Sequence, residues 1–318
     1  MYYFIVNRTG GSGRAAKTWH KVRMMLRNNQ MEYKAFLTKY EGHATVLAKN
    51  ISRLPDSEIK LIVVGGDGTV NEVLNGIEDF DRVSLGVIAT GSANDFISGI
   101  GIPRDTEAAI QRILDPKDNL TIDIGRVTAD GRRPRYFGIS CGVGLDAIVC
   151  KKALTSKLKR FLNKLGCGSL TYVILTVVNL FTMEYIRANV RYSMDEARTE
   201  DDYNSEGTVT EEYKKLIFLA AMNLPAEGGN VPMRPDALVD DGMISALAAD
   251  GIGKLRAFIS LPKLVAAKHR GIKGFHFEDA KYIDIELERP AVLHVDGEYY
   301  GDVSNIHIES CHKKLKLL

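Results

Sequence analysis

Residues 61–72 read Leu61-Ile62-Val63-Val64-Gly65-Gly66-Asp67-Gly68-Thr69-Val70-Asn71-Glu72, an apolar run that leads into a glycine turn. The apolar run is typical of a strand buried in a parallel sheet, and a helix is predicted after the turn. Glycines let a backbone approach an anion closely, and a helix N-terminus adds the positive end of its dipole. The stretch therefore favours phosphate binding, with a plain strand–helix turn capped by Asp67 as the alternative.

Two further polar glycine loops follow predicted strands. Residues 89–96, Ala-Thr-Gly-Ser-Ala-Asn-Asp-Phe, come after the strand-like run 84–88, and residues 7–13, Asn-Arg-Thr-Gly-Gly-Ser-Gly, come after Tyr2–Val6. Each loop alone could be a solvated turn. Because the carboxyl ends of parallel strands meet at one edge of a sheet, however, three such loops together predict one nucleotide cleft.

The alternation of strand-like and helical patterns continues to about residue 124 and then changes. Up to that point it predicts a Rossmann-like parallel sheet covered by helices, which we place at residues 1–125. Beyond it, hairpin signals and β-type runs predict a mainly antiparallel β-sandwich domain at 126–308, with a helix near 254–269. The tail, 309–318, is expected to pack back on the first domain, and the acidic stretch 195–212 is expected to be a solvated hairpin loop.

The composition excludes several classes of protein. A chain of 318 residues with a net charge of +2 lacks the strongly basic character of a nucleic-acid binder. The first residues show no basic region or cleavage site of a secretion signal, and the longest apolar run, 170–181, is too short to span a bilayer. We expect a cytoplasmic protein whose four cysteines are reduced, and we assign no catalytic role to its histidines.

At this point the chain resembles the diacylglycerol kinase catalytic-domain family, in particular its soluble bacterial lipid kinases. The resemblance spans nearly the whole chain and rests on the residues already quoted at 65–72 and 91–96 and on three later motifs. These motifs are Asp123-Ile124-Gly125, the segment Pro235-Asp236-Ala237-Leu238-Val239-Asp240-Asp241-Gly242-Met243, and Val295-Asp296-Gly297-Glu298.

The resemblance implies an ATP-dependent lipid kinase of phospholipid metabolism, with an ATP site in the glycine loops. Ser92 stands where the family more often has Thr, which keeps the hydroxyl group, and the loop from Asn7 departs from the commoner Asn-Pro-x-Ser-Gly form. An acidic network is implied at Asp67, Asp95 and Asp123. The implied ATP-binding residues are Asn7, Thr9, Gly10, Gly11, Thr38, Gly65, Gly66, Asp67, Gly68, Thr69, Val70, Asn71, Glu72 and Ser92.

The resemblance also implies a metal and a proton acceptor. A structural Mg²⁺ would be held by the carbonyls of Leu238 and Met243 and the carboxylate of Asp241, although this segment could equally be a turn between strands. Asp296 is implied as the general base that deprotonates the attacking hydroxyl. From the residues alone, its Asp-Gly sequence predicts a hairpin turn.

The expected partners are ATP and a membrane lipid, reached by transient peripheral contact, and a homodimer is an open expectation. Residues 147–183 contain six basic and no acidic residues, with apolar positions that can share one helical face, so a membrane-surface helix and an ordinary packed helix are both predicted. The acceptor lipid stays open among diacylglycerol, a sphingoid base and phosphatidylglycerol.

Two other functions stay open. An NAD kinase-like enzyme shares the Gly-Gly-Asp-Gly-Thr loop, although Asn71-Glu72 and Asp296-Gly297-Glu298 favour the lipid-kinase branch. A non-catalytic nucleotide- or lipid-binding regulator would be expected to lack the base or a loop, and this chain lacks neither. No Walker A pattern and no protein-kinase motif set occurs.

Overall fold

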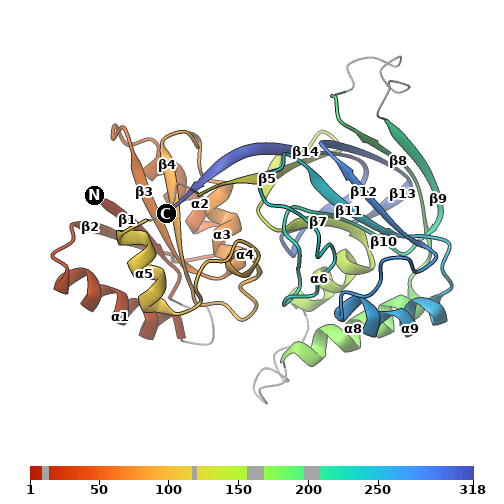
Figure 1. Cartoon of the computed structure of the whole chain (residues 1–318), viewed down its shortest axis with the longest axis horizontal. Helices are drawn as coiled ribbons and strands as arrows, with labels where there is room; N and C mark the ends of the chain where they lie inside the picture. The colour runs from red at the N-terminus through yellow and green to blue at the C-terminus, as the bar shows by residue number, and fades with distance from the viewer. Residues whose placement is uncertain (9–13, 117–119, 156–167, 197–207) are drawn as a thin grey trace.

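The computed structural model describes residues 1–8, 14–116, 120–155, 168–196 and 208–318, with the backbone alone at 154, 155 and 168–171. Figure 1 shows two parts joined by long strands. The elements of the first part are β1 (Tyr2–Val6), α1 (Arg14–Asn28), β2 (Tyr33–Leu37), α2 (His43–Ser52), β3 (Ile59–Gly65), α3 (Asp67–Leu74), β4 (Val83–Ala89), α4 (Asp95–Gly99) and α5 (Thr106–Leu114).

The first part is a parallel sheet in the order β4-β3-β1-β2, buried on both faces. Alternate side chains of a strand point to opposite faces. In β1, Tyr3 and Ile5 accordingly pack in the core formed with α2 and α3, whereas Phe4 and Val6 pack in the core formed with α1 and α5. This two-sided burial explains why the strands read as nearly continuous apolar runs.

The second part is mainly antiparallel. Its strands follow the order β12-β11-β10-β7-β13-β14; off this path β8 pairs with β13 and β9 with β8, whereas β5 pairs with β14 and β6 with β5. Its elements are β5 (Leu120–Ala129), β6 (Arg135–Phe137), β7 (Ser140–Gly144), α6 (Leu145–Thr155), α8 (Gly168–Thr182), β8 (Ile186–Ser193), β9 (Val209–Leu216), β10 (Phe218–Met222), β11 (Ile244–Ala249), α9 (Lys254–Val265), β12 (Phe275–Ala280), β13 (Tyr282–Val295) and β14 (Glu298–Leu317).

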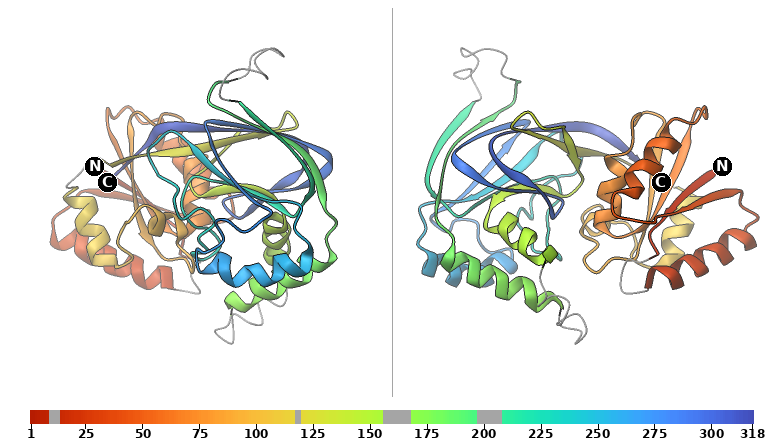
Figure 2. Two further views of the ribbon diagram at one scale, coloured as in Figure 1. Left: turned by 45° about the vertical axis from the view of Figure 1, so that its right-hand side comes forward. Right: turned by 180° about the vertical axis from the view of Figure 1, so that it is seen from behind.

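Three helices cover one face of this second part. Leu145 and Val149 of α6, Leu180 of α8 and Leu264 of α9 share one core with Phe218 of β10. Both views in Figure 2 place α8 and α9 beside each other at one end of the molecule. No helix among the described residues has both the length and the apolar character needed to cross a bilayer.

The strand β14 links the two parts. It pairs with β13 and β5 along most of its length, and its Lys316 and Leu317 then pair in parallel with Ser84 and Leu85 of β4. Leu318 lies in the core formed with α1 and α5. The predicted boundary at residue 125 falls inside β5, so the exact domain limits stay a prediction.

The predicted fold class is confirmed: a parallel α/β part precedes a mainly antiparallel β-sandwich-like part. One detail differs from the sequence prediction. Glu211 and Glu212, expected in a solvated loop, belong to β9, which pairs with β8. Only Tyr213 and Leu216 of this strand are buried, and Glu211 and Glu212 keep access to solvent, which is why acidic residues are tolerated in it. Residues 197–207 of the predicted loop lie outside the described residues.

Candidate active site

The ends of four parallel strands bring the predicted nucleotide loops together. The N–H of Asn7 donates to the carbonyl of Val64 over 2.9 Å, and the N–H of Thr90 donates to the carbonyl of Gly65 over 2.8 Å. Thr38 continues the row, because its N–H donates to the carbonyl of Val6 over 3.0 Å. The three predicted positions Thr9, Gly10 and Gly11 lie outside the described residues.

Glycine is required where the loop that contains Gly66 touches the loop that contains Gly91. A Cβ added to Gly66 would lie 3.0 Å from the Cα of Gly91, and a Cβ on Gly91 would lie 2.9 Å from the Cα of Gly66. The two backbones therefore approach more closely than side chains would allow. In the described structure, the absence of a side chain at Gly66 lets these two loops pack against each other.

The other predicted loop residues take different roles. Thr69 receives a hydrogen bond of 3.1 Å from the Asn7 side chain, and Val70 is buried in the core. Glu72 accepts the N–H of Ala44 over 2.9 Å and so satisfies the first turn of α2. Ser92 is exposed in the loop between β4 and α4.

Asp67 and Asp95 form the predicted acidic pair beside these loops. Asp67 accepts the N–H of Phe96 over 3.1 Å. Asp95 accepts the N–H groups of Gly229 and Asn230 over 2.8 and 2.7 Å, which anchors a loop of the second part. Burial raises the pKa of Asp67 to about 6, and the charge of Asp95 acts in the same direction. Two carboxylates therefore lie close together beside the glycine loops.

Asp123 does not join this pair. Its carboxylate is fully buried and accepts the N–H groups of Gly242 and Lys313, both over 2.6 Å, as well as a contact of 3.0 Å from His312. The sequence interpretation that grouped Asp123 with Asp67 and Asp95 is therefore not supported by its contacts. A motif identifies the residue type, but the direction of this side chain depends on the β14 segment that packs over it.

Asp123 instead braces the predicted structural-metal segment. In that segment Leu238 and Asp241 are exposed, and Asp241 Oδ1 accepts the N–H of Met243 over 3.0 Å. Two backbone carbonyls and a carboxylate are hard oxygen donors, which is the donor set that Mg²⁺ takes. The segment fits a cation, although its hydrogen bond is also that of an ordinary Asx turn.

Asp296 lies at the junction of the two parts, between β13 and β14. Its Oδ1 accepts the N–H groups of Ile139 and Ser140 over 2.8 and 3.0 Å. Its Oδ2 accepts the N–H of Gly138 over 2.9 Å and the amide of Asn71 over 2.8 Å. Burial raises the pKa of Asp296, and these four donors oppose the shift. Both carboxylate oxygens are thus engaged, which suits a positioning group better than a proton acceptor.

Asn71 is the matching residue on α3. It is fully buried; its Nδ2 donates to Asp296 and to the carbonyl of Tyr136, and its Oδ1 accepts the Arg135 guanidinium over 2.7 Å. Sequence reasoning placed Asn71 among the ATP ligands. The structure shows instead that its side chain bridges the two parts of the molecule.

Glu298 lies two residues beyond Asp296, at the phosphate loop. Its Oε1 lies 3.3 Å from the position that a Cβ on Gly68 would occupy. Glu298 and Gly68 line a hollow of about 660 Å³, together with Arg133 and Arg135. The sequence analysis quoted Glu298 without giving it a role, and it missed the two arginines. The run Arg132-Arg133-Pro134-Arg135 was the available signal for an anion-binding surface.

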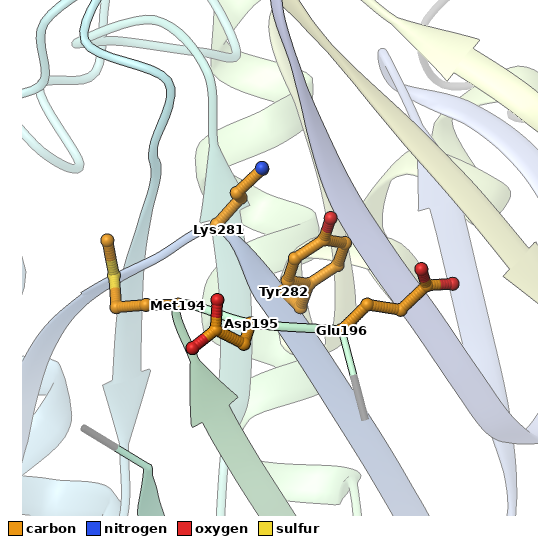
Figure 3. A pocket seen from close by; sticks show the side chains of 5 residues that line it. All are labelled: Met194, Asp195, Glu196, Lys281 and Tyr282. Carbon is orange, nitrogen blue, oxygen red and sulfur yellow. The ribbon is translucent and has the colours of Figure 1, made fainter. Parts of the chain in front are cut away.

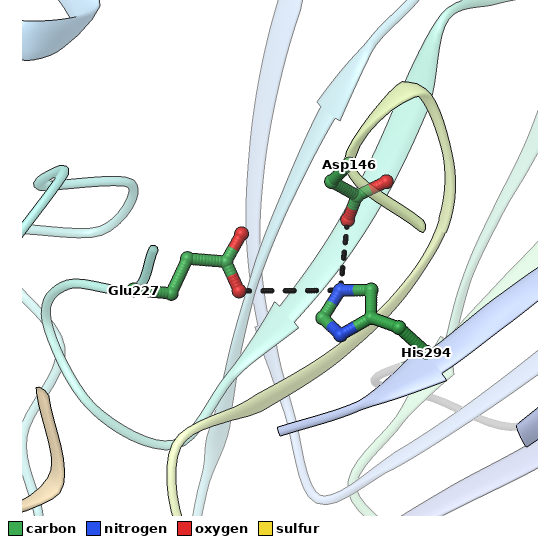
Figure 4. A group of neighbouring side chains, drawn as sticks. All are labelled: Asp146, Glu227 and His294. Carbon is green, nitrogen blue, oxygen red and sulfur yellow. Dashed lines mark hydrogen bonds and ion pairs between the residues drawn. The ribbon is translucent and has the colours of Figure 1, made fainter. Parts of the chain in front are cut away.

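A buried cluster of Asp146, Glu227 and His294 adjoins the Asp296 turn (Figure 4). His294 Nε2 lies 3.1 Å from Asp146 Oδ2 and 4.0 Å from Glu227 Oε2, and Ser140 donates to Glu227. The Nδ1 of His294 lies 3.2 Å from the backbone nitrogen of Gly297. Burial alone would lower the pKa of His294, but the carboxylates outweigh burial and raise the pKa to about 9.

The sequence analysis gave the histidines no catalytic role, and this cluster shows that His294 of β13 has two acidic neighbours. His294 and His269 are each only 1% exposed, and His294 contacts the turn that carries Asp296. One imidazole nitrogen and two carboxylates within 4.8 Å of one another could also ligate a divalent cation. In the structure a hydrogen bond already joins the imidazole to Asp146.

A smaller hollow of about 290 Å³ lies at the far end of β8 (Figure 3). Its lining is polar and comes from the β8 end and the start of β13, with Asp195, Glu196 and Lys281 among the residues shown. None of the glycine-loop residues lines it. We assign it no part in the site.

Comparison with protein families gives two matches that cover most of the chain. Residues 1–127 match the family described as diacylglycerol kinase catalytic domain. Residues 140–318 match the family described as YegS C-terminal NAD kinase beta sandwich-like domain. The two matched regions follow the change from parallel to antiparallel structure.

Individual relatives agree with these matches. The chain is 29% identical over 306 residues to a Bacillus subtilis protein named "Putative lipid kinase YtlR", covering 94% of each chain. It is 30% identical over 301 residues to a diacylglycerol kinase of Staphylococcus saprophyticus, covering 93% of this chain and 88% of that one. A crystal structure titled as a putative diacylglycerol kinase of Bacillus anthracis has the same fold, with a TM-score of 0.73, 22% identity and coverage of 99% and 96%.

Proposed function

This chain belongs to the diacylglycerol kinase catalytic-domain family, and on that premise we propose that it transfers the terminal phosphate of ATP to the hydroxyl group of diacylglycerol or a related membrane lipid. One observation carries the proposal. The turn of residues 296–298 in the second part is held against the phosphate loop of the first part by the hydrogen bond between Asn71 and Asp296. This contact supports the proposal because it holds the turn that carries Glu298 beside the glycine loop, and both line one hollow.

In this proposal Glu298 accepts the proton. The lipid O–H bond breaks as its oxygen attacks the terminal phosphorus, the bond from phosphorus to ADP breaks, and Glu298 takes the released proton. Asp296 was the sequence-based choice for this role, and it stays a prediction. The carboxylate of Glu298 lies at Gly68 and lines the hollow.

The proposed cofactor is Mg²⁺. The charges of Asp95 and Asp296 both raise the pKa of Asp67, and three carboxylates are a donor set that fits a hard cation. Both oxygens of Asp95 and both oxygens of Asp296 accept N–H groups, whereas Asp67 accepts the N–H of Phe96 at Oδ1, so Asp67 would hold the ion that accompanies ATP. Bound there, Mg²⁺ would neutralise charge on the phosphates. A structural Mg²⁺ at Leu238, Asp241 and Met243 is a second proposal.

The test is phosphate transfer from labelled ATP to a panel of lipids in mixed micelles. Glu298→Gln should lower turnover at least ~10²-fold at unchanged melting temperature, the effect typical of losing a general base. Asp296→Asn should lower the melting temperature as well, because its amide would face N–H donors. Glu286→Gln, at an exposed position of β13, is the matched control.

The opposite result would restore Asp296 as the base: normal turnover in Glu298→Gln, with turnover lost and the fold intact in Asp296→Asn. The same assay separates the two alternatives. An NAD kinase-like enzyme would phosphorylate NAD instead of lipid, and a regulator would bind ATP without transferring phosphate. Cytoplasmic location, reversible membrane association and a homodimer remain proposals of the same kind.

A further inference from the structure

The helix α8 presents apolar side chains to solvent. Val173, Ile174, Val178 and Phe181 are all exposed, with Val173 at 58%. Positions 174, 178 and 181 repeat at helical spacing and share one face. The opposite side of the helix is buried through Leu180, which packs in the core with α6 and β10. The helix therefore carries two apolar faces, only one of which is covered.

The helix α9 has the same character. Leu255, Phe258, Ile259 and Val265 are exposed, with Leu255 and Ile259 above 60%. Their spacing of three, four and seven to ten residues again describes one face. On its other side Ala257, Ser260 and Leu264 are buried. An apolar stripe usually marks the buried side of a surface helix, so a second stripe facing water is unusual.

The two exposed stripes form one surface, here termed the α8–α9 face. The rings of Phe181 and Phe258 lie 5.9 Å apart, and Lys254 at the start of α9 donates to the carbonyls of Phe181 and Met183. Of the 17 large apolar side chains exposed in the described residues, four lie on α8 and four on α9. Nearly half of these exposed apolar side chains thus belong to two helices, which lie beside each other in Figure 2.

The charges on the two helices themselves are all positive. Neither helix contains an acidic residue, and residues 251–277 include six basic residues and no acidic one. Arg256, Lys263, Lys268 and Lys273 are exposed, whereas Arg270 pairs with Asp236. Residues 147–183 have the same composition, but Lys157, Lys159, Arg160 and Lys164, on which the sequence-based membrane prediction rested, lie outside the described residues.

The α8–α9 face also connects to the site. The helix α6 packs on α8, and Leu145 and Val149 of α6 share the core of Leu180. The next residue after Leu145 is Asp146, which holds His294 beside the catalytic turn. One helix therefore separates the exposed apolar surface from the residues that adjoin Asp296 and Glu298.

We propose that the α8–α9 face seats this enzyme on the surface of an anionic phospholipid bilayer, with its apolar stripes in the headgroup boundary and its basic residues on the lipid phosphates. The inference rests on the proposed function in one respect, namely that the acceptor is a membrane lipid. A second copy of this chain is a poorer occupant. A symmetric contact would bring each basic surface against itself.

The experiment measures co-sedimentation with vesicles of phosphatidylcholine that contain phosphatidylglycerol, without ATP or an acceptor lipid. Two double variants change the face: Leu255→Gln with Ile259→Gln, and Arg256→Glu with Lys263→Glu. Their matched controls, all exposed, are Met24→Gln with Val46→Gln and Lys17→Glu with Lys34→Glu. Both face variants should reduce vesicle binding by at least about tenfold, and the controls should not. Pure phosphatidylcholine vesicles should bind the parent weakly.

Activity gives the second readout. In the Leu255 and Ile259 variant, turnover of diacylglycerol in vesicles should fall while turnover of a water-dispersed short-chain diacylglycerol stays at the parent level. The proposal is overturned if the parent does not bind anionic vesicles, or if both face variants bind them like the parent. It is also overturned if the parent dimerises through this face and does not bind vesicles. Vesicle binding without transfer to any lipid would refute the kinase function and leave the docking surface standing.

Discussion

Asn71 Nδ2 donates a hydrogen bond of 2.8 Å to Asp296 Oδ2, although 225 residues separate the two in the sequence. The contact joins the helix that follows the phosphate loop to the turn that carries Glu298. Asn71 also binds Tyr136 and Arg135 of β6, so one buried amide holds two segments of the second part, β6 and the turn at Asp296, against α3. In the proposed function, the position of Glu298 relative to the glycine loop 65–68 depends on this residue.

Replacing Asn71 with Ala should therefore reduce both stability and turnover. The change leaves the buried Asp296 carboxylate with one donor fewer, which costs about 1–3 kcal/mol in the free energy of unfolding. Urea unfolding gives the stability and the labelled-ATP assay gives the turnover. The control is Asn50→Ala, at an exposed position of α2. If the two variants unfold at the same urea concentration, the bridge does not contribute as described.

Gly66→Ala should weaken ATP binding, because the new Cβ would meet Gly91 at 3.0 Å and push the two loops apart. Isothermal titration with ATP and Mg²⁺ measures the affinity. Gly253→Ala makes the same change where no atom lies within 4 Å of the added Cβ and where φ is −65°. Equal ATP affinity in both variants would show that the close approach of the loops is not needed for the nucleotide.

Asp241→Ala should abolish Mg²⁺-dependent stabilisation if the segment 238–243 binds a structural cation. An ion that binds only the folded state raises the melting temperature by mass action, and a site without its carboxylate binds less of it. A titration of melting temperature against Mg²⁺, without ATP, measures this effect. Asp240→Ala, at the exposed neighbouring position, is the control. If the melting temperature of the parent protein does not change with Mg²⁺, the segment 238–243 is a turn and binds no structural cation.

The buried imidazole of His294 predicts a loss of stability at alkaline pH. Its pKa in the folded protein is raised from 6.5 to about 9, and Asp146, Glu227 and Asp296 are the acidic groups that face it. A raised folded pKa gives a contribution that is complete below the unfolded pKa and is lost as pH rises through the folded one. This contribution, on the order of 3 kcal/mol, should therefore disappear between about pH 6.5 and 9.

Urea unfolding across this pH range tests the point. The parent should lose stability as pH rises, whereas His294→Gln should start lower and change less. His20→Gln, at an exposed position of α1, should follow the parent. A His294→Gln curve parallel to that of the parent would mean that the imidazole does not carry a proton in the folded protein. Loss of that proton also lets Nδ1 accept the N–H of Gly297, so the pH dependence of turnover is a useful companion measurement.

The sequence predicted what local patterns determine. The alternation of buried strands and amphipathic helices predicted the parallel part. The glycine loops predicted a nucleotide cleft at the edge of the sheet where the strands have their carboxyl ends. It could not predict the direction of individual carboxylates. Asp123 and Asp296 stand in recognisable motifs, yet segments distant in the sequence supply the N–H groups that engage them. Glu298 belongs to the same motif as Asp296, but only the fold places Glu298 against Gly68.

The exposed stripes of α8 and α9 show a second limit. Apolar residues at helical spacing normally indicate the side of a helix that is buried. Leu255 and Leu264 are indistinguishable by type, but one is 65% exposed and the other 7%. Which of two apolar sides faces the core depends on how the helix packs on β10 and β11. The sequence could therefore predict amphipathic character near 147–183, but not where an uncovered surface would lie.

The long strand β14 has a consequence for how the protein is made. Leu315 and Leu317 fill the core between the parallel sheet and the helices α2 and α3, and Leu318 fills the core on the opposite face. These residues leave the ribosome almost 200 positions after β5 begins. The nucleotide-binding half, although it is encoded first, cannot close either of its cores until residues 315–318 have emerged. The first part should therefore gain its ATP affinity late in translation. It should do so when the second part folds, and not earlier.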